Sequence, residues 1–358
     1  MKISRIRAYQ VALPMGEGAY AWGTQSFAAF DSTVLVIDTD EGLSGVGEIC
    51  PLGPSYLPTY AEGARTGIEL LARDLIGEDP LAIDVLNHKM DALMKGHPYV
   101  KSAIDMACWD LLGKATGLPV CELLGGRFTD QVRLFRVISR DTPDNMVAKL
   151  KDHRADGFMQ FQMKVGEHPD VDIERMRAVC GELRDDEVLA ADANTGWKQH
   201  EAIRVMQSTA DLPLYIEQPC LSYEECLVVR QHTMQPIILD ECMDSLRTLL
   251  RGVADGAMDL INLKISRAGG LTRARQIRDL CVSLGIVMTI EDTWGGEIAT
   301  AAIAHLAGST PTGFHFQSSP FHTYATISIA DGGPVVKDGH MSVSTAPGLG
   351  VEPIFDVR

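Results

Sequence analysis

The sequence lacks a long hydrophobic run, a Cys-x-x-Cys pair and an excess of basic residues. No apolar run approaches the ~20 residues that cross a bilayer, so no membrane-spanning helix is expected. The start, MKISRIRAYQVALP, has neither the apolar stretch nor the small-residue cleavage site of a signal peptide. None of the eight cysteines forms a Cys-x-x-Cys pair, which excludes a zinc knuckle and a thioredoxin motif. We therefore expect a cytoplasmic enzyme with reduced thiols.

The charge balance argues against two classes of partner. The chain has 32 Lys and Arg against 48 Asp and Glu, a formal net charge of −16. Nucleic acids and anionic membranes both require basic patches, so neither is an expected partner. Hydrophobic residues make up 46% of the 358 residues and charged residues 22%, which excludes a disordered chain. This length predicts two domains, or one barrel with an additional domain.

The first 125 residues are typical of an α+β domain. Alternating apolar residues predict a meander of three strands, at 2–13, 30–42 and 42–50. Helical periodicity follows at 60–77, 81–94 and 99–117, and the last of these ends at a glycine cap signal.

Two irregular segments interrupt this first domain. Residues 15–27 and 50–60 combine glycine or proline with aromatic residues. Polar linkers rarely contain aromatic residues, so we expect both segments to be functional loops.

From about residue 130, short apolar runs alternate with amphipathic stretches. This alternation predicts repeated βα units with a parallel sheet, and seven or eight units fit before residue 325. The expected fold is therefore an α/β protein: a (β/α)₈ barrel over 126–325, with an N-terminal α+β capping domain over 1–125. We expect the tail, 326–358, to return to the first domain.

Charged residues end the apolar runs at an interval of one βα unit. The spacings are 28, 25, 23, 24 and 28 residues along Lys164, Asp192, Glu217, Asp240, Lys264 and Asp292. The carboxyl ends of parallel barrel strands meet at one face, where the active sites of barrel enzymes lie. The spacing therefore predicts two lysines and four acids around one barrel mouth.

The three carboxylates of Asp192, Glu217 and Asp240 come from consecutive predicted strands. Carboxylates brought together raise each other's pKa unless a cation offsets them, and oxygen ligands suit Mg²⁺. The alternative is that each acid caps a helix in a βα loop. Three in succession, each after an apolar run, favour a metal site.

Lys164 and Lys264 lie on the strands that flank the three acids. A lysine beside a dication is pushed towards its neutral form, which is a competent base. Two such lysines can remove and return protons on opposite faces of a bound substrate. The alternative is surface lysines in ion pairs, which the apolar run LINLKIS around Lys264 makes less favourable.

Four further residues are candidate substrate contacts: Tyr56, Asp292, Thr293 and Trp294. Gln162 and Asn194 are candidates to orient the metal ligands. Tyr56 and Trp294 offer aromatic faces, or pack the cap on the barrel. Asp292 precedes Thr293 and is expected to bond Lys264 or a substrate amine, or to cap the helix at 297–306. Asn194 orients a ligand or satisfies a turn.

The pattern of these residues resembles that of the enolase superfamily, and within it that of the subgroup similar to muconate-lactonizing enzymes. The resemblance covers essentially the whole chain: KSAIDMACWDLLGK and LPVCELLGG, the ligand motifs ADAN, IEQP and LDE, and NLKISRAGG. It implies a homo-oligomeric enzyme that binds a small carboxylate substrate through Mg²⁺ and removes the proton α to that carboxylate. The lysines Lys164 and Lys264 would transfer the proton.

One position departs from the subgroup pattern. Where Lys-x-Lys is common on the second strand, this chain has Gln162-Met163-Lys164. With GEICPLGPSY and EDTWGGE, this pattern resembles the betaine epimerases of proline and hydroxyproline, and the cis-3-hydroxy-L-proline dehydratases. After the eighth strand, Ser318 and Ser319 stand in a segment without tryptophan, which favours a free amine over a quaternary one.

The expected reaction is therefore dehydration of cis-3-hydroxy-L-proline to Δ1-pyrroline-2-carboxylate. The hydroxyl and the α-hydrogen lie on opposite ring faces, so this elimination is anti and needs a base and an acid on opposite faces. The same pair of lysines supports the alternative, a 2-epimerase or racemase. A Schiff-base lyase that uses Lys164 or Lys264 as nucleophile is a second enzyme class.

Overall fold

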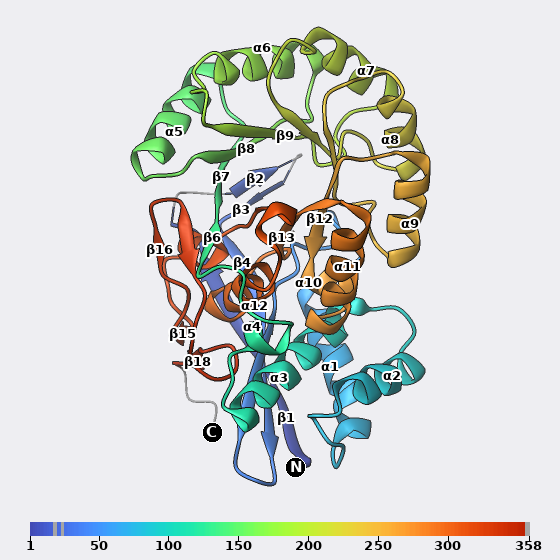
Figure 1. Ribbon diagram of the computed structural model, residues 1–358, viewed down its shortest axis with the longest axis vertical. Coiled ribbons are helices and arrows are strands. Elements are labelled where there is room, and N and C mark those ends of the chain that lie inside the picture. The colour runs from blue at the N-terminus through green and yellow to red at the C-terminus, as the bar shows by residue number, and fades with distance from the viewer. Residues whose placement is uncertain (17–19, 23–24, 355–358) are drawn as a thin grey trace.

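The structure is a computed structural model that describes residues 1–16, 20–22 and 25–354 (Figure 1). The N-terminal part contains an antiparallel sheet in the order β1-β4-β5, so the predicted meander is confirmed. Its strands are β1 (Ile3–Pro14), β4 (Ala29–Thr39) and β5 (Ser44–Ile49). Its helices are α1 (Ala61–Leu75), α2 (Ile83–Leu93), α3 (Pro98–Thr116) and α4 (Val120–Leu123).

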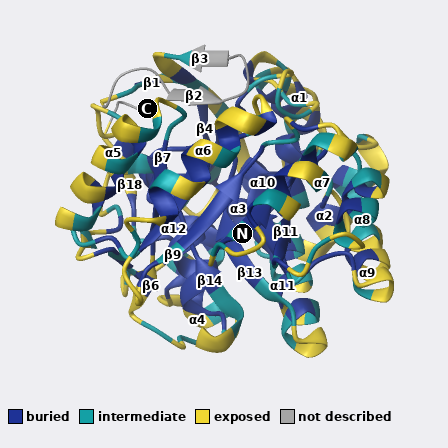
Figure 2. Ribbon diagram, turned by 90° about the horizontal axis from the view of Figure 1, so that it is seen from above, coloured by how far each residue is buried: buried dark blue, intermediate teal, exposed yellow. Residues whose placement is uncertain are grey.

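Most residues of helix α3 are buried (Figure 2). Strand β5 packs directly on it through two glycines. A Cβ at Gly47 would come within 2.1 Å of the Ala103 carbonyl oxygen, and one at Gly45 within 2.3 Å of the Ala107 carbonyl oxygen. The predicted glycine cap is Gly117, which ends α3 in a left-handed conformation with φ 71°.

The segment 15–27 is not wholly irregular. It contains a short hairpin of β2 (Tyr20–Trp22) and β3 (Gln25–Phe27). Residues 17–19 and 23–24 of this expected loop lie outside the described residues. The second segment, 50–60, contains no helix or strand.

Eight parallel strands form the nearly closed barrel, so the predicted (β/α)₈ fold is confirmed. Strands β14 and β7 meet through a single bridge between Leu134 and Ser318. The strands are β7 (Phe135–Ile138), β8 (Gln160–Lys164), β9 (Val188–Asp192), β10 (Tyr215–Glu217), β11 (Ile237–Leu239), β12 (Leu260–Lys264), β13 (Val287–Glu291) and β14 (His315–Gln317).

Helices surround the barrel, and several of them expose their outer faces (Figure 2), whereas α12 (Glu297–Gly308) is buried along its whole length. The α-helices are α5 (Pro143–Ala155), α6 (Pro169–Cys180), α7 (Gln199–Ser208), α8 (Tyr223–Arg230), α9 (Leu246–Asp255), α10 (Ile265–Ala268), α11 (Leu271–Leu284) and α12 (Glu297–Gly308). Two 3₁₀-helices, η1 (Thr312–Phe314) and η2 (Phe321–Tyr324), flank β14. No helix in the described part of the chain is long and apolar enough to cross a membrane.

The C-terminal tail contacts the N-terminal helices as well as the barrel. Its strands are β15 (Ala330–Asp331), β16 (Val336–Lys337), β17 (His340–Ser342) and β18 (Glu352–Pro353), and β17 pairs with β6 (Gln131–Arg133). The Leu349 backbone N–H donates to Asp110 of α3 at 2.8 Å, and Lys114 of α3 forms an ion pair with Glu352 at 3.0 Å.

Candidate active site

The carboxyl ends of the barrel strands bring the predicted charged residues to one mouth. Lys164, Asp192 and Glu217 end β8, β9 and β10 and lie side by side in register. Asp240 directly follows β11. Lys264 ends β12, and its partner in register is Glu291 at the end of β13.

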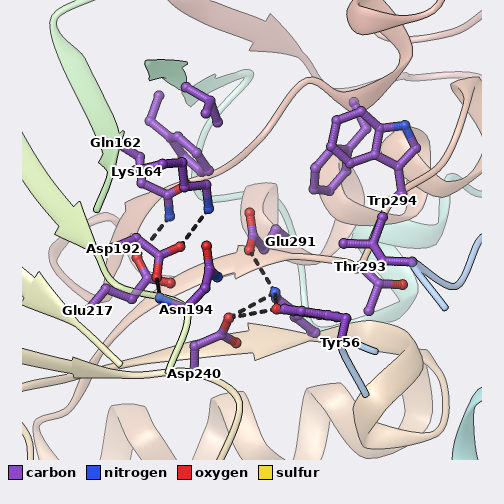
Figure 3. Close-up of a pocket in the computed structure, with 15 residues that line it drawn as sticks. Tyr56, Gln162, Lys164, Asp192, Asn194, Glu217, Asp240, Glu291, Thr293 and Trp294 are labelled. Carbon is purple, nitrogen blue, oxygen red and sulfur yellow. Dashed lines mark hydrogen bonds and ion pairs between the residues drawn. The ribbon is translucent and has the colours of Figure 1, made fainter. Parts of the chain in front are cut away.

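One pocket at this mouth contains almost every predicted site residue (Figure 3). The cap contributes Leu52 and Tyr56 from the segment 50–60, so cap and barrel together enclose the pocket. The predicted residues that line it are Tyr56, Gln162, Lys164, Asp192, Asn194, Glu217, Asp240, Lys264, Thr293 and Trp294. Asp292 does not line it.

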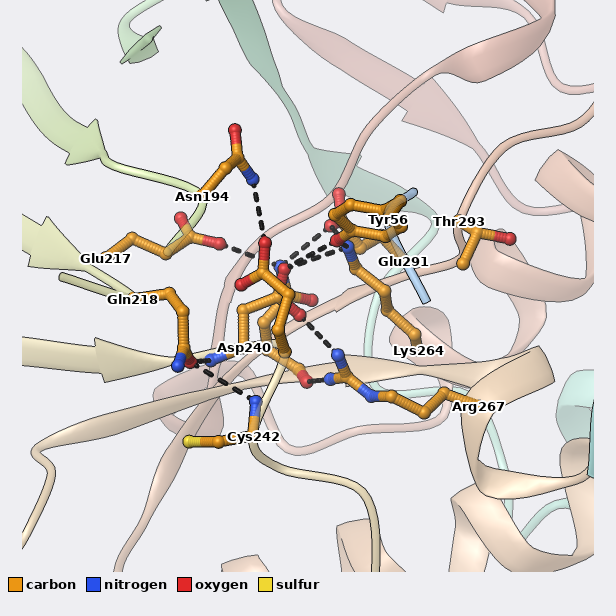
Figure 4. Close-up of polar contacts among 12 residues, drawn as sticks. Tyr56, Asn194, Glu217, Gln218, Asp240, Cys242, Lys264, Arg267, Glu291 and Thr293 are labelled. Carbon is orange, nitrogen blue, oxygen red and sulfur yellow. Dashed lines mark hydrogen bonds and ion pairs between the residues drawn. The ribbon is translucent and has the colours of Figure 1, made fainter. Parts of the chain in front are cut away.

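Two of the three carboxylates form ion pairs with the two lysines. Lys164 Nζ lies 2.6 Å from Asp192 Oδ2, and Lys264 Nζ lies 2.9 Å from Asp240 Oδ2. Arg267, which the sequence analysis missed, donates from Nη1 to Asp240 Oδ1 at 2.6 Å (Figure 4). Burial opposes ionisation of Asp240, but Lys264 and Arg267 outweigh it and hold its pKa below the usual value.

Glu217 contacts amides instead of a cation. Gln162 Nε2 donates to Glu217 Oε2 at 2.9 Å, and Asn262 Nδ2 donates to Glu217 Oε1 at 3.0 Å. Burial raises the pKa of Glu217, and the neighbouring charges of Asp192 and Asp240 raise it further. The negative charges of Asp192 and Asp240 therefore disfavour the ionised form of Glu217.

The described residues contain no group of three or more His, Cys, Asp or Glu side chains that is spaced to hold a metal ion. The reason is local, because Asp192 and Asp240 face the lysines and Glu217 faces the two amides. Asn194 lies beside these acids. Its backbone N–H donates to Asp192 Oδ1 at 2.8 Å, and its Nδ2 donates to Glu241 Oε1 at 3.0 Å.

The two lysines lie on opposite sides of the barrel. Strands β8 and β12 are four positions apart in the eight-stranded order, which is half of the circumference. Both side chains are nearly buried, with Lys164 at 6% and Lys264 at 5% relative exposure. The geometry can therefore present one amine to each face of a small ligand between them.

The pKa of Lys264 differs from the expectation that this lysine is pushed towards its neutral form. Burial lowers its pKa, but the nearby carboxylates of Asp240 and Glu291 outweigh that effect, and the net pKa lies above the ordinary value. Its Nζ also lies 2.5 Å from the Tyr56 hydroxyl, which itself lies 3.0 Å from Asp240 Oδ2. Lys264 is thus an ammonium held by three oxygen atoms in this arrangement.

The spacing placed Asp292 at the barrel mouth, but Glu291 lines the pocket in its place. The Asp292 carboxylate accepts hydrogen bonds from the backbone N–H and hydroxyl of Ser266 and from the Thr293 backbone N–H. Glu291 instead lines the pocket, 3.5 Å from Lys264 Nζ. Neighbouring residues of a strand point to opposite faces, so a shift of one residue decides which acid enters the barrel.

Apolar side chains also line the pocket. They are Leu52, Phe135, Val137, Trp294 and Phe321. The Trp294 and Phe321 ring centroids are 4.9 Å apart. Ser318 and Ser319, which the sequence analysis connected with a free amine, are buried and do not line the pocket.

Comparison with known families matches both parts of the chain. Residues 10–125 match the mandelate racemase/muconate lactonizing enzyme N-terminal domain, and residues 145–357 match the enolase C-terminal domain-like family. The chain is 54% identical to cis-3-hydroxy-L-proline dehydratase of Roseibium aggregatum, over 100% of this chain and 98% of that protein. It is 29% identical to N-succinyl-L-Arg/Lys racemase of Bacillus cereus, over 86% of this chain and 85% of that protein.

Solved structures are similar over nearly the whole chain. A mandelate racemase/muconate lactonizing enzyme from Roseovarius nubinhibens superposes with a TM-score of 0.96 at 44% identity, covering 99% of this chain and 96% of that one. A member of the enolase superfamily from the same organism, complexed with magnesium, has a TM-score of 0.93 at 41% identity, covering 98% and 96%.

Proposed function

The chain belongs to the mandelate racemase/muconate lactonizing enzyme family of the enolase superfamily, and on that basis we propose that it dehydrates cis-3-hydroxy-L-proline to Δ1-pyrroline-2-carboxylate. The observation that carries the chemistry is the placement of Lys164 and Lys264 on opposite sides of one pocket. The choice of substrate rests on the 54% identity to a cis-3-hydroxy-L-proline dehydratase.

The two lysines divide the reaction between them. One amine, in its neutral form, takes the proton α to the substrate carboxylate. The ammonium on the other side gives a proton to the departing 3-hydroxyl, which leaves as water. The product of this anti elimination is an enamine that tautomerises to Δ1-pyrroline-2-carboxylate, so protons and water balance. The Trp294 and Phe321 rings, which line the pocket in contact with each other, suit the methylene groups of the substrate ring.

Asp192, Glu217 and Asp240 would hold the Mg²⁺ ion. All three are hard oxygen donors. Burial raises the pKa of Glu217, the charges of Asp192 and Asp240 raise it further, and a bound dication would offset that repulsion. When bound, Mg²⁺ supplies a positive charge that binds the substrate carboxylate and offsets the negative charge that develops as the α-proton leaves. Asn194, which binds Asp192 through its backbone, would orient that ligand.

A 2-epimerase of proline betaine or a related amino acid is the second candidate. The observation that favours it is the aromatic character of the pocket, which Tyr56, Phe135, Trp294 and Phe321 all line. Aromatic faces bind quaternary ammonium groups. The two lysines would then remove the α-proton from one face and return a proton on the other.

The two diastereomers of 3-hydroxy-L-proline test the proposal. The cis isomer has its hydroxyl and α-hydrogen on opposite faces and should yield Δ1-pyrroline-2-carboxylate. The trans isomer has both on one face and should yield none. Proline betaine is the third substrate to be tested. Incorporation of deuterium at its C2 in D₂O, with no consumption of cis-3-hydroxy-L-proline, would move the assignment to an epimerase.

Chelation separates the proposal from a Schiff-base lyase. We expect EDTA to abolish turnover of cis-3-hydroxy-L-proline and added Mg²⁺ to restore it. Turnover that survives full chelation, together with a substrate adduct trapped on Lys164 or Lys264 by borohydride, would instead establish Schiff-base chemistry.

A further inference from the structure

Asn262 lies beneath the pocket on β12, two residues before Lys264, and it is only 1% exposed. Its side-chain amide reaches two acids on two different strands. Nδ2 donates to Glu217 Oε1 at 3.0 Å and to Glu291 Oε1 at 2.7 Å. One amide nitrogen has two hydrogens, so these two carboxylates use its whole donor capacity.

Within the described residues, no hydrogen bond to the side-chain oxygen of Asn262 helps to orient this amide. Asn262 Oδ1 is buried and has no hydrogen-bond partner among the described residues. Carboxylate oxygens accept hydrogen bonds and cannot face a carbonyl oxygen favourably, so the nitrogen must point towards Glu217 and Glu291. The amide therefore sets the separation of these two acids.

The backbone of Asn262 is connected to Asp240 through Arg267. Arg267 donates from Nη2 to the Asn262 carbonyl oxygen at 2.5 Å and from Nη1 to Asp240 Oδ1 at 2.6 Å. Two proposed magnesium ligands, Glu217 and Asp240, are thus connected to one residue, through its side chain and its backbone respectively.

We propose that Asn262 is a positioning residue that couples the metal ligand Glu217 to Glu291, the acid that faces Lys264. The inference rests on the proposed function. Removal of the Asn262 side chain takes one hydrogen bond from each acid at once, so it affects metal affinity through Glu217 and proton transfer through Glu291. The Arg267 contact to the backbone survives that change.

Gln162 is the comparison for metal affinity, because it is also a buried amide and donates to the other oxygen of Glu217. Asn262→Ala and Gln162→Ala should each weaken Mg²⁺ binding about 10-fold or more, measured by calorimetry without substrate. Asn262→Ala should also lower kcat about 10-fold at saturating Mg²⁺, whereas Asn145→Ala, which removes an exposed amide that donates to Asp141 outside the pocket, should leave kcat unchanged. An unchanged Mg²⁺ affinity in Asn262→Ala, or a kcat equal to that of Asn145→Ala, would overturn the proposal.

A double-mutant cycle with Glu291→Gln tests the coupling itself. If Asn262 acts through Glu291, adding Asn262→Ala to Glu291→Gln should lower kcat by less than about 2-fold, whereas independent effects would multiply and refute the coupling. Asn262→Leu keeps about the same side-chain size without a hydrogen-bond donor and serves if the alanine variant does not fold. Calorimetry needs no substrate, so a failed turnover of cis-3-hydroxy-L-proline would count against the proposed function and leave the Asn262 result intact.

Discussion

Each of the two lysines proposed to transfer protons contacts at least one carboxylate. Lys164 contacts Asp192, and Lys264 contacts Asp240 and Glu291. The raised pKa of Lys264 depends on these carboxylates. A cation that engages the carboxylates would remove that influence and allow burial to favour the neutral amine. The neutral lysine expected from the sequence is therefore a property we assign to the metal-bound enzyme.

The first prediction concerns Lys164. Replacing it with alanine should lower kcat for dehydration of cis-3-hydroxy-L-proline by about 10²- to 10⁴-fold, because one of the two proton-transfer groups is lost. Lys151→Ala is the control, since Lys151 is exposed and pairs with Glu182 away from the pocket. Near wild-type turnover in Lys164→Ala, measured by proton NMR, would rule out the two-lysine mechanism.

The second prediction distinguishes two adjacent acids. Glu291→Gln should lower kcat/KM about 10- to 100-fold, since Glu291 faces Lys264 and holds the Asn262 amide. Asp292→Asn should instead lower the free energy of unfolding by about 1–3 kcal/mol, because Asp292 accepts three buried hydrogen bonds. Steady-state kinetics and urea unfolding of both variants check this, and the reverse pattern would contradict the assignment.

The spacing of charged residues predicted which strand ends meet, because it depends only on the length of a βα unit. It did not show which of Glu291 and Asp292 enters the barrel, since that depends on strand register to within one residue. Asn262 and Arg267 were missed for a different reason. Their roles come from contacts with Glu217, Glu291 and Asp240 on or after other strands, and the segment LINLKISR that contains both residues has no pattern that indicates them.

At the scale of elements, the cap depends on the close contact between β5 and α3. The sequence predicted both elements, but the burial of nearly all of α3 follows from its position between the sheet, the barrel and the C-terminal tail. The contact also extends to the barrel through Glu48 of β5. Its carboxylate accepts hydrogen bonds from the backbone N–H groups of Gly296 and Ala299, at 2.7 and 2.9 Å.

The third prediction tests this contact. Gly47→Ala should destabilise the protein by about 1–3 kcal/mol, because the added Cβ would lie 2.1 Å from the Ala103 carbonyl oxygen and would force β5 away from α3. Gly313→Ala is the control, since no atom lies within 4 Å of its added Cβ. Thermal and urea unfolding measure both. Equal stability of the two variants would mean that the close approach is not required.

At the scale of the whole molecule, His305 joins the C-terminal tail and α4 to α12. Its Nδ1 accepts from the Cys121 backbone N–H at 3.1 Å, so its Nε2–H donates to the Leu349 carbonyl oxygen at 3.0 Å. Burial lowers the pKa of His305 to about 4. The folded protein therefore keeps this ring neutral at pH values where the unfolded chain binds a proton.

The fourth prediction follows from that difference. The contribution of His305 to stability is complete above its unfolded pKa of about 6.5 and declines as the pH falls towards 4. The stability difference between wild type and His305→Gln should shrink by about 2 kcal/mol between pH 7.5 and pH 5. Urea unfolding at the two pH values measures it, and a difference that does not change with pH would contradict the neutral, buried histidine.

A homo-oligomeric state and a cytoplasmic location, which the sequence analysis expects, stay predictions. So do the domain boundaries at residues 125 and 325. The comparisons match the two parts of the chain at 10–125 and 145–357, and the tail contacts both of them.

The most direct test of the central claim is a proton NMR time course of cis-3-hydroxy-L-proline with the wild-type protein and Mg²⁺ in D₂O. Two lysines on opposite sides of a magnesium-binding pocket predict that the C2 and C3 proton signals decay while those of Δ1-pyrroline-2-carboxylate grow. Substrate signals that stay unchanged, with Mg²⁺ binding verified by calorimetry in the same sample, would contradict it.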